Sequence, residues 1–79
     1  MDIQEKIVQL VKEIVMRNVN ADQPLLSNNL LSSIDMVELA VNIEEAFKIK
    51  IDATEITVES FDTIEKISDF ISKRLNEKN

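Results

Sequence analysis

Five residue types are missing from this chain of 79 residues: cysteine, histidine, glycine, tryptophan and tyrosine. The lack of cysteine excludes disulfides, thiolate nucleophiles and thiolate-bound metals. The lack of histidine removes both the usual base for a serine nucleophile and the imidazole metal ligand. The lack of glycine excludes the phosphate-binding P-loop, the dinucleotide-binding fingerprint and the EF-hand loop. Catalysis would depend on carboxylates, lysines and hydroxyls alone, so we expect a protein that is not an enzyme and holds no metal.

Positive charge is also scarce, because nine basic residues stand against fifteen acidic ones and leave a net charge of −6. Such a surface repels nucleic acid and anionic lipid headgroups, and a basic patch on another protein is its natural complement. No apolar run approaches the about 18 residues of a membrane-spanning helix, and the first residues lack the positively charged start of a signal peptide. We therefore expect a cytoplasmic location without membrane insertion.

The spacing of the apolar residues predicts an all-α fold in a single domain covering residues 1–79. It is a small bundle of three main helices plus one short helix around an aliphatic core. The main helices cover residues 2–17, residues 33–47 and the segment from about residue 62 onward, and the short helix covers residues 53–60. The expected inward positions are Ile3, Ile7, Leu10, Val11, Ile14 and Val15; Ile34, Val37, Ala40, Val41, Ile43 and Phe47; Ile56 and Val58; and Ile64, Ile67, Phe70, Ile71 and Leu75.

Two stretches lack a helical period and are expected to connect the helices. Residues 18–32 contain the only proline and four leucines, so we expect this segment to fold back over the core. Residues 48–52 alternate charge and isoleucine, but a lone strand has nothing to pair with, and we expect an extended connector. The expected helix caps are Ser32 or Ser33, Asp52 and Asp62.

The acidic excess is confined to the middle of the chain. Residues 32–62 hold eight acidic and two basic residues, which accounts for the whole net charge. Along the predicted second helix, only Glu44 with Lys48 pairs opposite charges four residues apart. The carboxylates form either an ordinary solvated helix face or a docking surface for a basic partner. Those of the second helix are Asp35, Glu38, Glu44 and Glu45.

Ser33 stands where the leucine-bearing segment meets the predicted second helix. A serine in this position ordinarily serves as a helix cap. It cannot act alone as a nucleophile, because the chain has no histidine to accept its proton. A phosphate ester there would be stabilised, since it would lie at the positive end of the helix dipole beside unsatisfied N–H groups. Ser33 is therefore a candidate attachment point for an anionic prosthetic group.

Two segments resemble the acyl carrier protein family, SSIDMVELAVNIEEAF at residues 32–47 and IDATEITVESFDTIEKISDFI at residues 51–71. The first is similar to the family's second helix, in which Asp-Ser-Leu precedes Val-Glu-Leu and a later Glu-Glu pair before Phe. The match of Val37-Glu38-Leu39 fixes the register and puts the family's modified serine on Ser33, with Ser32 as the alternative.

The chain departs from the family pattern at two points before that serine. Ser32 stands where Asp is usual, and Asn29-Leu30-Leu31 stands where a glycine is often found. The Leu-Leu approach resembles stand-alone carriers such as the D-alanyl and aminoacyl carrier proteins.

The resemblance implies that Ser33 carries 4′-phosphopantetheine, whose thiol holds an acyl or aminoacyl group as a thioester. The implied partners of this monomer are a phosphopantetheinyl transferase and acyl- or aminoacyl-loading and transfer enzymes, which would dock on Asp35, Glu38, Glu44 and Glu45. A cargo groove lined by Val41, Ile51, Ile56 and Phe61 is a further expectation, and ordinary core is the simpler interpretation of all four. The pathway stays open among fatty acid, polyketide, aminoacyl and D-alanyl transfer. The alternative is a cofactor-free helical adaptor that binds basic protein surfaces through its acidic second helix.

Overall fold

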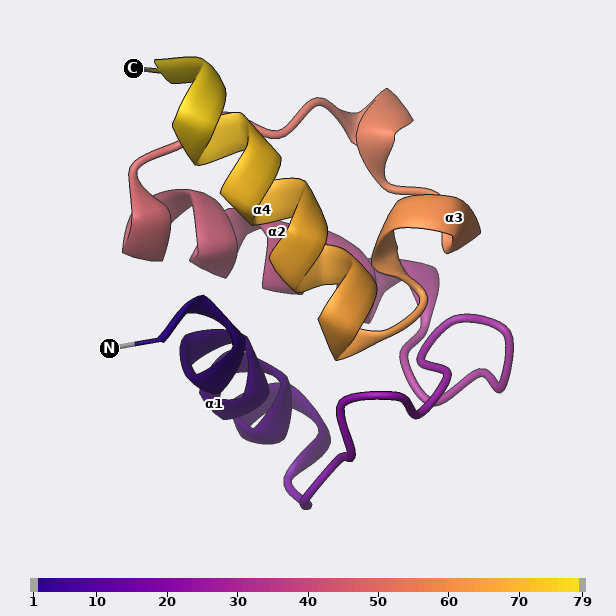
Figure 1. Ribbon diagram of the computed structural model, residues 1–79. Coiled ribbons are helices and arrows are strands. Elements are labelled where there is room, and N and C mark those ends of the chain that lie inside the picture. Colours follow the sequence, from indigo (N-terminus) through magenta and orange to yellow (C-terminus); the bar gives the residue numbers. More distant parts are fainter. Residues whose placement is uncertain (1, 79) are drawn as a thin grey trace.

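Three long helices enclose one apolar core in the computed structural model, which describes residues 2–78 and the side chains of residues 2–76 (Figure 1). α1 packs against both α2 and α4, and the short helix α3 packs against α4. The predicted all-α bundle is confirmed. The helices are α1 (Ile3–Val15), α2 (Ser33–Phe47), α3 (Val58–Phe61) and α4 (Ile64–Lys78), and a single 3-10 turn (Ala53–Glu55) precedes α3.

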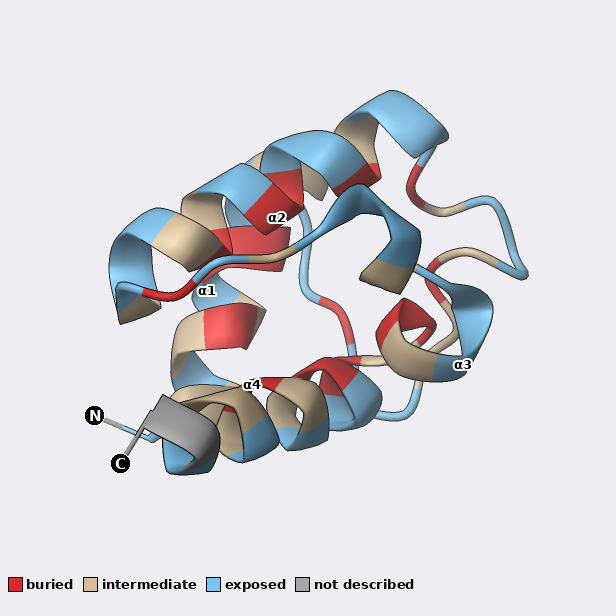
Figure 2. Ribbon diagram, turned by 90° about the horizontal axis from the view of Figure 1, so that it is seen from above, coloured by how far each residue is buried: buried red, intermediate tan, exposed pale blue. Residues whose placement is uncertain are grey.

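The core is mainly aliphatic, with Phe61 as its fully buried aromatic residue, and every long helix contributes to it. The buried faces of the helices turn toward one another, while the outer surfaces of α2 and α4 are exposed (Figure 2). Two core leucines, Leu25 and Leu31, come from the connection between α1 and α2, which confirms that this segment folds back over the core. The side chains without exposed surface are Ile7, Val11, Leu25, Leu39, Ile43, Phe61, Ile64, Ile67 and Ile71.

α1 is capped at both ends by residues other than glycine. The carboxylate of Asp2 accepts a hydrogen bond from the backbone N–H of Gln4 at 3.3 Å and caps the first turn. The helix ends at Val15, and its C-cap Met16 has a left-handed backbone (φ 61°) and an N–H that donates to the carbonyl of Lys12 at 2.7 Å. The observed helix is therefore one residue shorter at its start and two residues shorter at its end than the predicted helix over residues 2–17.

α2 has the predicted bounds but buries only part of the predicted face: Ala40 and Ile43 are buried and Phe47 packs against the core, as predicted. The sequence pattern places Ile34, Val37 and Val41 inside, yet their side chains are 80%, 55% and 47% exposed. The reason is that α2 carries two apolar stripes on different sides, and periodicity alone does not choose between them. The buried stripe is the longer one, since it continues to the half-buried Phe47. It consists of Met36, Leu39, Ala40 and Ile43.

The connector after α2 is extended, as predicted, and the short helix that follows is divided in two. Asp52 caps the 3-10 turn, in a capping box with Glu55, and this predicted cap is confirmed. Thr57 then starts α3 with its own cap, because its hydroxyl accepts the N–H of Ser60 at 3.3 Å. The break turns Val58 outward, 51% exposed, so its predicted inward position is wrong, whereas Ile56 packs against the core.

Asp62 closes α3 instead of starting α4. Its side chain is only 8% exposed and is bonded to the connection between α1 and α2. The hydroxyl of Thr63 accepts the N–H of Lys66 at 3.1 Å and caps α4 in its place. The predicted cap at Asp62 is wrong, because a distant segment already occupies that carboxylate.

Candidate functional site

The two serines at the start of α2 have different roles. Ser32 is the cap: its hydroxyl accepts the N–H of Asp35 at 3.1 Å, and the Asp35 carboxylate accepts the N–H of Ser32 at 3.1 Å. This reciprocal pair satisfies two backbone groups that a helix end otherwise leaves unbonded. Ser33 is the first helical residue and its side chain is exposed. The cap therefore holds the backbone of Ser33 in place without using its hydroxyl.

The surroundings of Ser33 combine two features: the positive end of a helix dipole, which suits an anionic ester, and an apolar depression. Ser33 lies at the N-terminal end of a 15-residue helix, where the helix dipole stabilises negative charge. A shallow apolar depression beside it is lined by Ser33, Ile34, Val37 and Glu38. Sequence reasoning placed Ile34 and Val37 in the core and missed their position beside the serine. The available signal was their spacing with Val41, which is separate from the stripe that begins at Met36.

The four carboxylates of α2 differ in what they do. Glu38 and Glu45 are exposed, whereas Asp35 and Glu44 are half-buried. Asp35 is part of the cap at the helix start. Glu44 accepts the N–H of Ile51 at 2.7 Å and so fastens the connector after α2 to the helix. The predicted acidic surface thus has two freely solvated members and two that also stabilise the fold.

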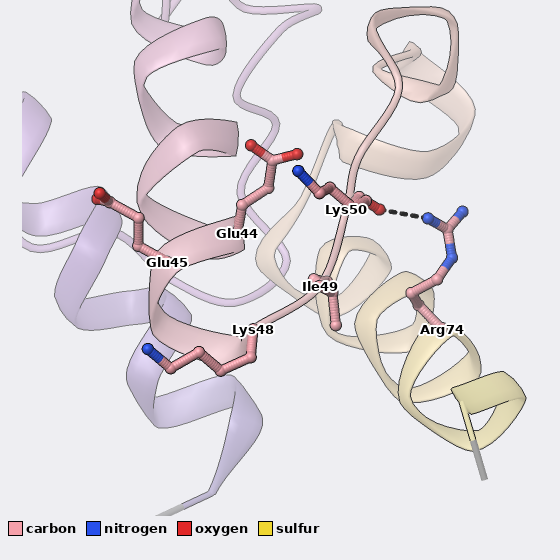
Figure 3. Close-up of a pocket in the computed structure, with 6 residues that line it drawn as sticks. All are labelled: Glu44, Glu45, Lys48, Ile49, Lys50 and Arg74. Carbon is pink, nitrogen blue, oxygen red and sulfur yellow. Dashed lines mark hydrogen bonds between the residues drawn. The ribbon is translucent and has the colours of Figure 1, made fainter.

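The connector is also held from the other side, by α4 (Figure 3). Arg74 donates to the carbonyl of Lys50 and to the carboxylate of Glu55, and its guanidinium stacks on Phe70 with Cζ 5.0 Å from the ring centroid. Arg74 and Lys50 also line a depression at the C-terminal end of α2, together with Glu44, Glu45, Lys48 and Ile49. In it, the side chains of Glu44 and Lys50 point toward each other. The connector is therefore a fixed bridge between α2 and α4.

Two acids at the 3-10 turn, its cap Asp52 and its last residue Glu55, have pKa values below their usual range. The backbone N–H of Asp52 and then the Arg74 side chain lower the pKa of Glu55. The backbone N–H and then the hydroxyl of Thr54 lower the pKa of Asp52. Both carboxylates are therefore ionised at neutral pH and act as fixed acceptors.

The four residues predicted to line a cargo groove are not equivalent. Phe61 lies in the core without exposed surface, and its ring meets that of Phe70 at 5.2 Å between centroids. Ile51 and Ile56 are half-buried against the same core, while Val41 is 47% exposed on α2. The groove stays a prediction, and the burial of Phe61 agrees with the core interpretation for that residue. Within residues 2–78, no helix is both long and apolar enough to cross a membrane.

Comparison with known proteins adds an independent finding. The family described as "Phosphopantetheine attachment site" matches residues 5–71. The chain is similar to the D-alanyl carrier protein of Streptococcus suis (strain 98HAH33), with 35% identity over 69 residues, 85% of this chain and 87% of the relative. It is also similar to the D-alanyl carrier proteins of Streptococcus sanguinis (strain SK36) and Streptococcus uberis (strain ATCC BAA-854 / 0140J). Identities are 28% and 31% over 78 residues, 96% of this chain and 99% of each relative.

Proposed function

Because this chain belongs to the acyl carrier protein family, whose shared feature is a phosphopantetheine attachment site, we propose that Ser33 is the residue that carries the arm. The chain is a carrier protein, and its prosthetic group is covalently attached 4′-phosphopantetheine. When bound, that group supplies a thiol that holds the cargo as a thioester, which this cysteine-free chain does not itself offer. The adaptor alternative is not favoured.

The observation that carries the proposal is that Ser32 caps α2 whereas Ser33 does not. The capping box occupies Ser32 and fixes the first turn of α2, while the neighbouring hydroxyl of Ser33 is exposed. A modified residue must be reachable by another enzyme and must be held in one position. Ser33 meets both needs, and the positive end of α2 stabilises the phosphodiester that would form there.

The change from the usual Asp to Ser32 is mild in physical terms. Serine and aspartate are comparably good helix caps, because each offers an oxygen to the N–H groups of the first turn. Ser32 performs this role with Asp35 as its partner. We therefore expect the substitution to leave the position of Ser33 unchanged.

Docking is proposed to use the exposed carboxylates of α2. Glu38 and Glu45 are exposed and would meet lysine or arginine patches on the phosphopantetheinyl transferase and on loading and transfer enzymes. Such rim charges accelerate encounter more than they strengthen the final complex, which suits a carrier that must also dissociate. Asp35 and Glu44 would add to the same field, although each also bonds within the fold.

The proposed cargo is an aminoacyl group of the D-alanyl class. Its support is the similarity to three proteins named D-alanyl carrier protein, two of which align over nearly their whole length. The chain would be a non-catalytic carrier, because the reactive thiol would come from the arm and the chemistry from partner enzymes. A cytoplasmic location and a monomeric state remain predictions of the same proposal.

The test is modification by coenzyme A and a phosphopantetheinyl transferase, read by intact mass. The wild-type chain is expected to gain one phosphopantetheine, and Ser33→Ala is expected to gain none. Ser32→Asp is the matched control, because it removes the neighbouring hydroxyl while keeping a good cap. It should gain one group like the wild type. Modification of Ser33→Ala, or its absence in Ser32→Asp, would contradict the assignment.

A further inference from the structure

The segment that leads to Ser33 contains a small closed loop. Within residues 25–31, the N–H of Leu31 donates to the carbonyl of Leu25 at 3.0 Å, and the N–H of Asn29 donates to the carbonyl of Leu26 at 3.0 Å. Asn29 adopts a left-handed backbone (φ 57°), which asparagine tolerates better than most residues. Leu25 and Leu31 are the buried ends of this loop. Residues 25–31 therefore behave as one unit that ends directly before the cap of α2.

One side chain fastens this loop to a segment that is distant in sequence. The Oδ1 atom of Asp62 accepts the N–H groups of Leu26 and Ser27, both at 2.9 Å, and Oδ2 accepts the hydroxyl of Ser27 at 2.8 Å. The backbone carbonyl of Asp62 also accepts the N–H of Leu25 at 2.6 Å. Four hydrogen bonds thus join the loop to a residue more than thirty positions away, at the junction of α3 and α4.

We propose that Asp62 is a positioning residue for the modification of Ser33, an inference that rests on the function proposed above. The connection is short: Asp62 holds Leu25, Leu25 holds Leu31, and Leu31 precedes the cap residue Ser32. A loop released from Asp62 would leave the approach to Ser33 without its anchor. The carboxylate touches no reacting atom and would act only through the loop.

A carboxylate is well suited to this task. Its two oxygens accept several hydrogen bonds at once, and bonds to an ionised acceptor are stronger than neutral ones. The N–H of Ser27 is the main cause that lowers the pKa of Asp62, and the Ser27 hydroxyl and the N–H of Leu26 act in the same direction. Asparagine could keep part of the pattern, because its Oδ1 accepts N–H groups and its Nδ2 can donate to the Ser27 hydroxyl. Alanine could keep none of the side-chain bonds.

The inference makes a specific kinetic prediction. If the transferase binds only chains whose loop is anchored, then the apparent dissociation constant equals the intrinsic one divided by the anchored fraction. A chain that has bound still reacts at the usual rate. Asp62→Ala should therefore raise the KM of the transferase for this protein by about tenfold with kcat unchanged, Asp62→Asn by a smaller factor, and Ser27→Ala by about two- to threefold. A general loss of folded protein would also raise the apparent KM, because the chain is the substrate, so circular dichroism measures the folded fraction and KM is calculated for the folded protein alone.

The experiment combines steady-state modification kinetics with amide hydrogen exchange on the full chain. Asp69→Ala is the matched control, because it removes an exposed carboxylate from α4 and should leave KM unchanged. The expected result is faster exchange at Leu26, Ser27 and Leu31 in the Asp62 variants, together with the graded rise in KM. If Asp62→Ala does not fold, then Asp62→Asn and Ser27→Ala carry the test.

Two outcomes would overturn the inference. One is a KM equal to that of the wild type in variants whose loop amides exchange faster, because the loop would then be released without consequence. The other is unchanged exchange at the loop in all the variants. Failure of the proposed function is distinguishable, since in that case the wild-type chain would itself gain no phosphopantetheine on Ser33.

Discussion

The orientation of α2 about its own axis places Ile34 and Val37 outward beside Ser33, and a matched pair of substitutions tests it. Ile34 and Ile43 lie on the same helix, but Ile34 is 80% exposed whereas Ile43 has no exposed surface. Ile→Val removes one methylene group at either site and keeps a β-branched side chain of similar helix propensity. The two substitutions therefore differ almost only in burial.

The expected magnitudes follow from that burial. In the core, Ile43→Val should cost about 0.5–1.5 kcal/mol of the free energy of unfolding. At Ile34 only about a fifth of the side chain is buried, so loss of a methylene worth about 0.8 kcal/mol should cost less than about 0.2 kcal/mol. For a domain of this size, 1 kcal/mol corresponds to about 4–8 °C in Tm.

The assay is urea and thermal unfolding of both variants and the wild type, followed by circular dichroism. Equal m-values would show that each substitution changes stability and not the denatured state. We expect a clear loss for Ile43→Val and a Tm within about 2 °C of the wild type for Ile34→Val. A cost at Ile34 equal to or greater than that at Ile43 would refute the orientation and, with it, the apolar depression that Ile34 and Val37 form beside Ser33.

Three further predictions concern the backbone, the connector and pH. Met16→Gly should stabilise the protein by about 0.5–1 kcal/mol in thermal unfolding. The reason is that a left-handed backbone is strained in a residue with a side chain, and this strain exceeds the extra chain entropy that glycine loses on folding. Met16→Ala keeps the strain and should give no such gain. Arg74→Met should cost about 1 kcal/mol in urea unfolding and should accelerate amide exchange at Ile51, because it keeps an unbranched side chain of similar length but removes the guanidinium that holds Lys50, Glu55 and Phe70. Unchanged exchange there would contradict the bridge. The pKa of Asp62 is lowered in the folded state, so its ionised form adds stability that is complete above the unfolded pKa of about 3.9 and is lost as the pH falls through the lower, folded pKa. The stability difference between the wild type and Asp62→Asn should therefore shrink below about pH 4, and a difference independent of pH would contradict the anchor.

The long helices could be predicted from the sequence because their signals are local. Apolar spacing marks α1, α2 and α4, and the register of Val37-Glu38-Leu39, compared with the family pattern, predicts that Ser33 is the modified residue. The capping pair of Asp52 and Glu55 is also local, since the two residues are three positions apart. Each of these features depends on neighbours within about one helical turn.

What could not be predicted depends on residues that are distant in sequence. The side of α2 that is buried is decided by packing against α1, and the apolar pattern of α2 fits two orientations. Asp62 has the local pattern of a helix cap, but its carboxylate is engaged by Ser27, 35 positions earlier. Glu44 binds the backbone N–H of Ile51 on the connector, a contact that the helical pattern of α2 does not indicate. In each case the deciding contact lies outside the local pattern.

The central claim is tested most directly by locating the modification on the wild-type chain. The protein should be treated with coenzyme A and a phosphopantetheinyl transferase, digested, and fragmented by tandem mass spectrometry in a mode that retains the ester. Fragment ions that separate the two neighbouring serines should place the whole added mass on Ser33 and leave Ser32 unmodified. Fragments that carry the mass on Ser32 would contradict the account, because the hydroxyl that caps α2 would then be the one that partner enzymes use.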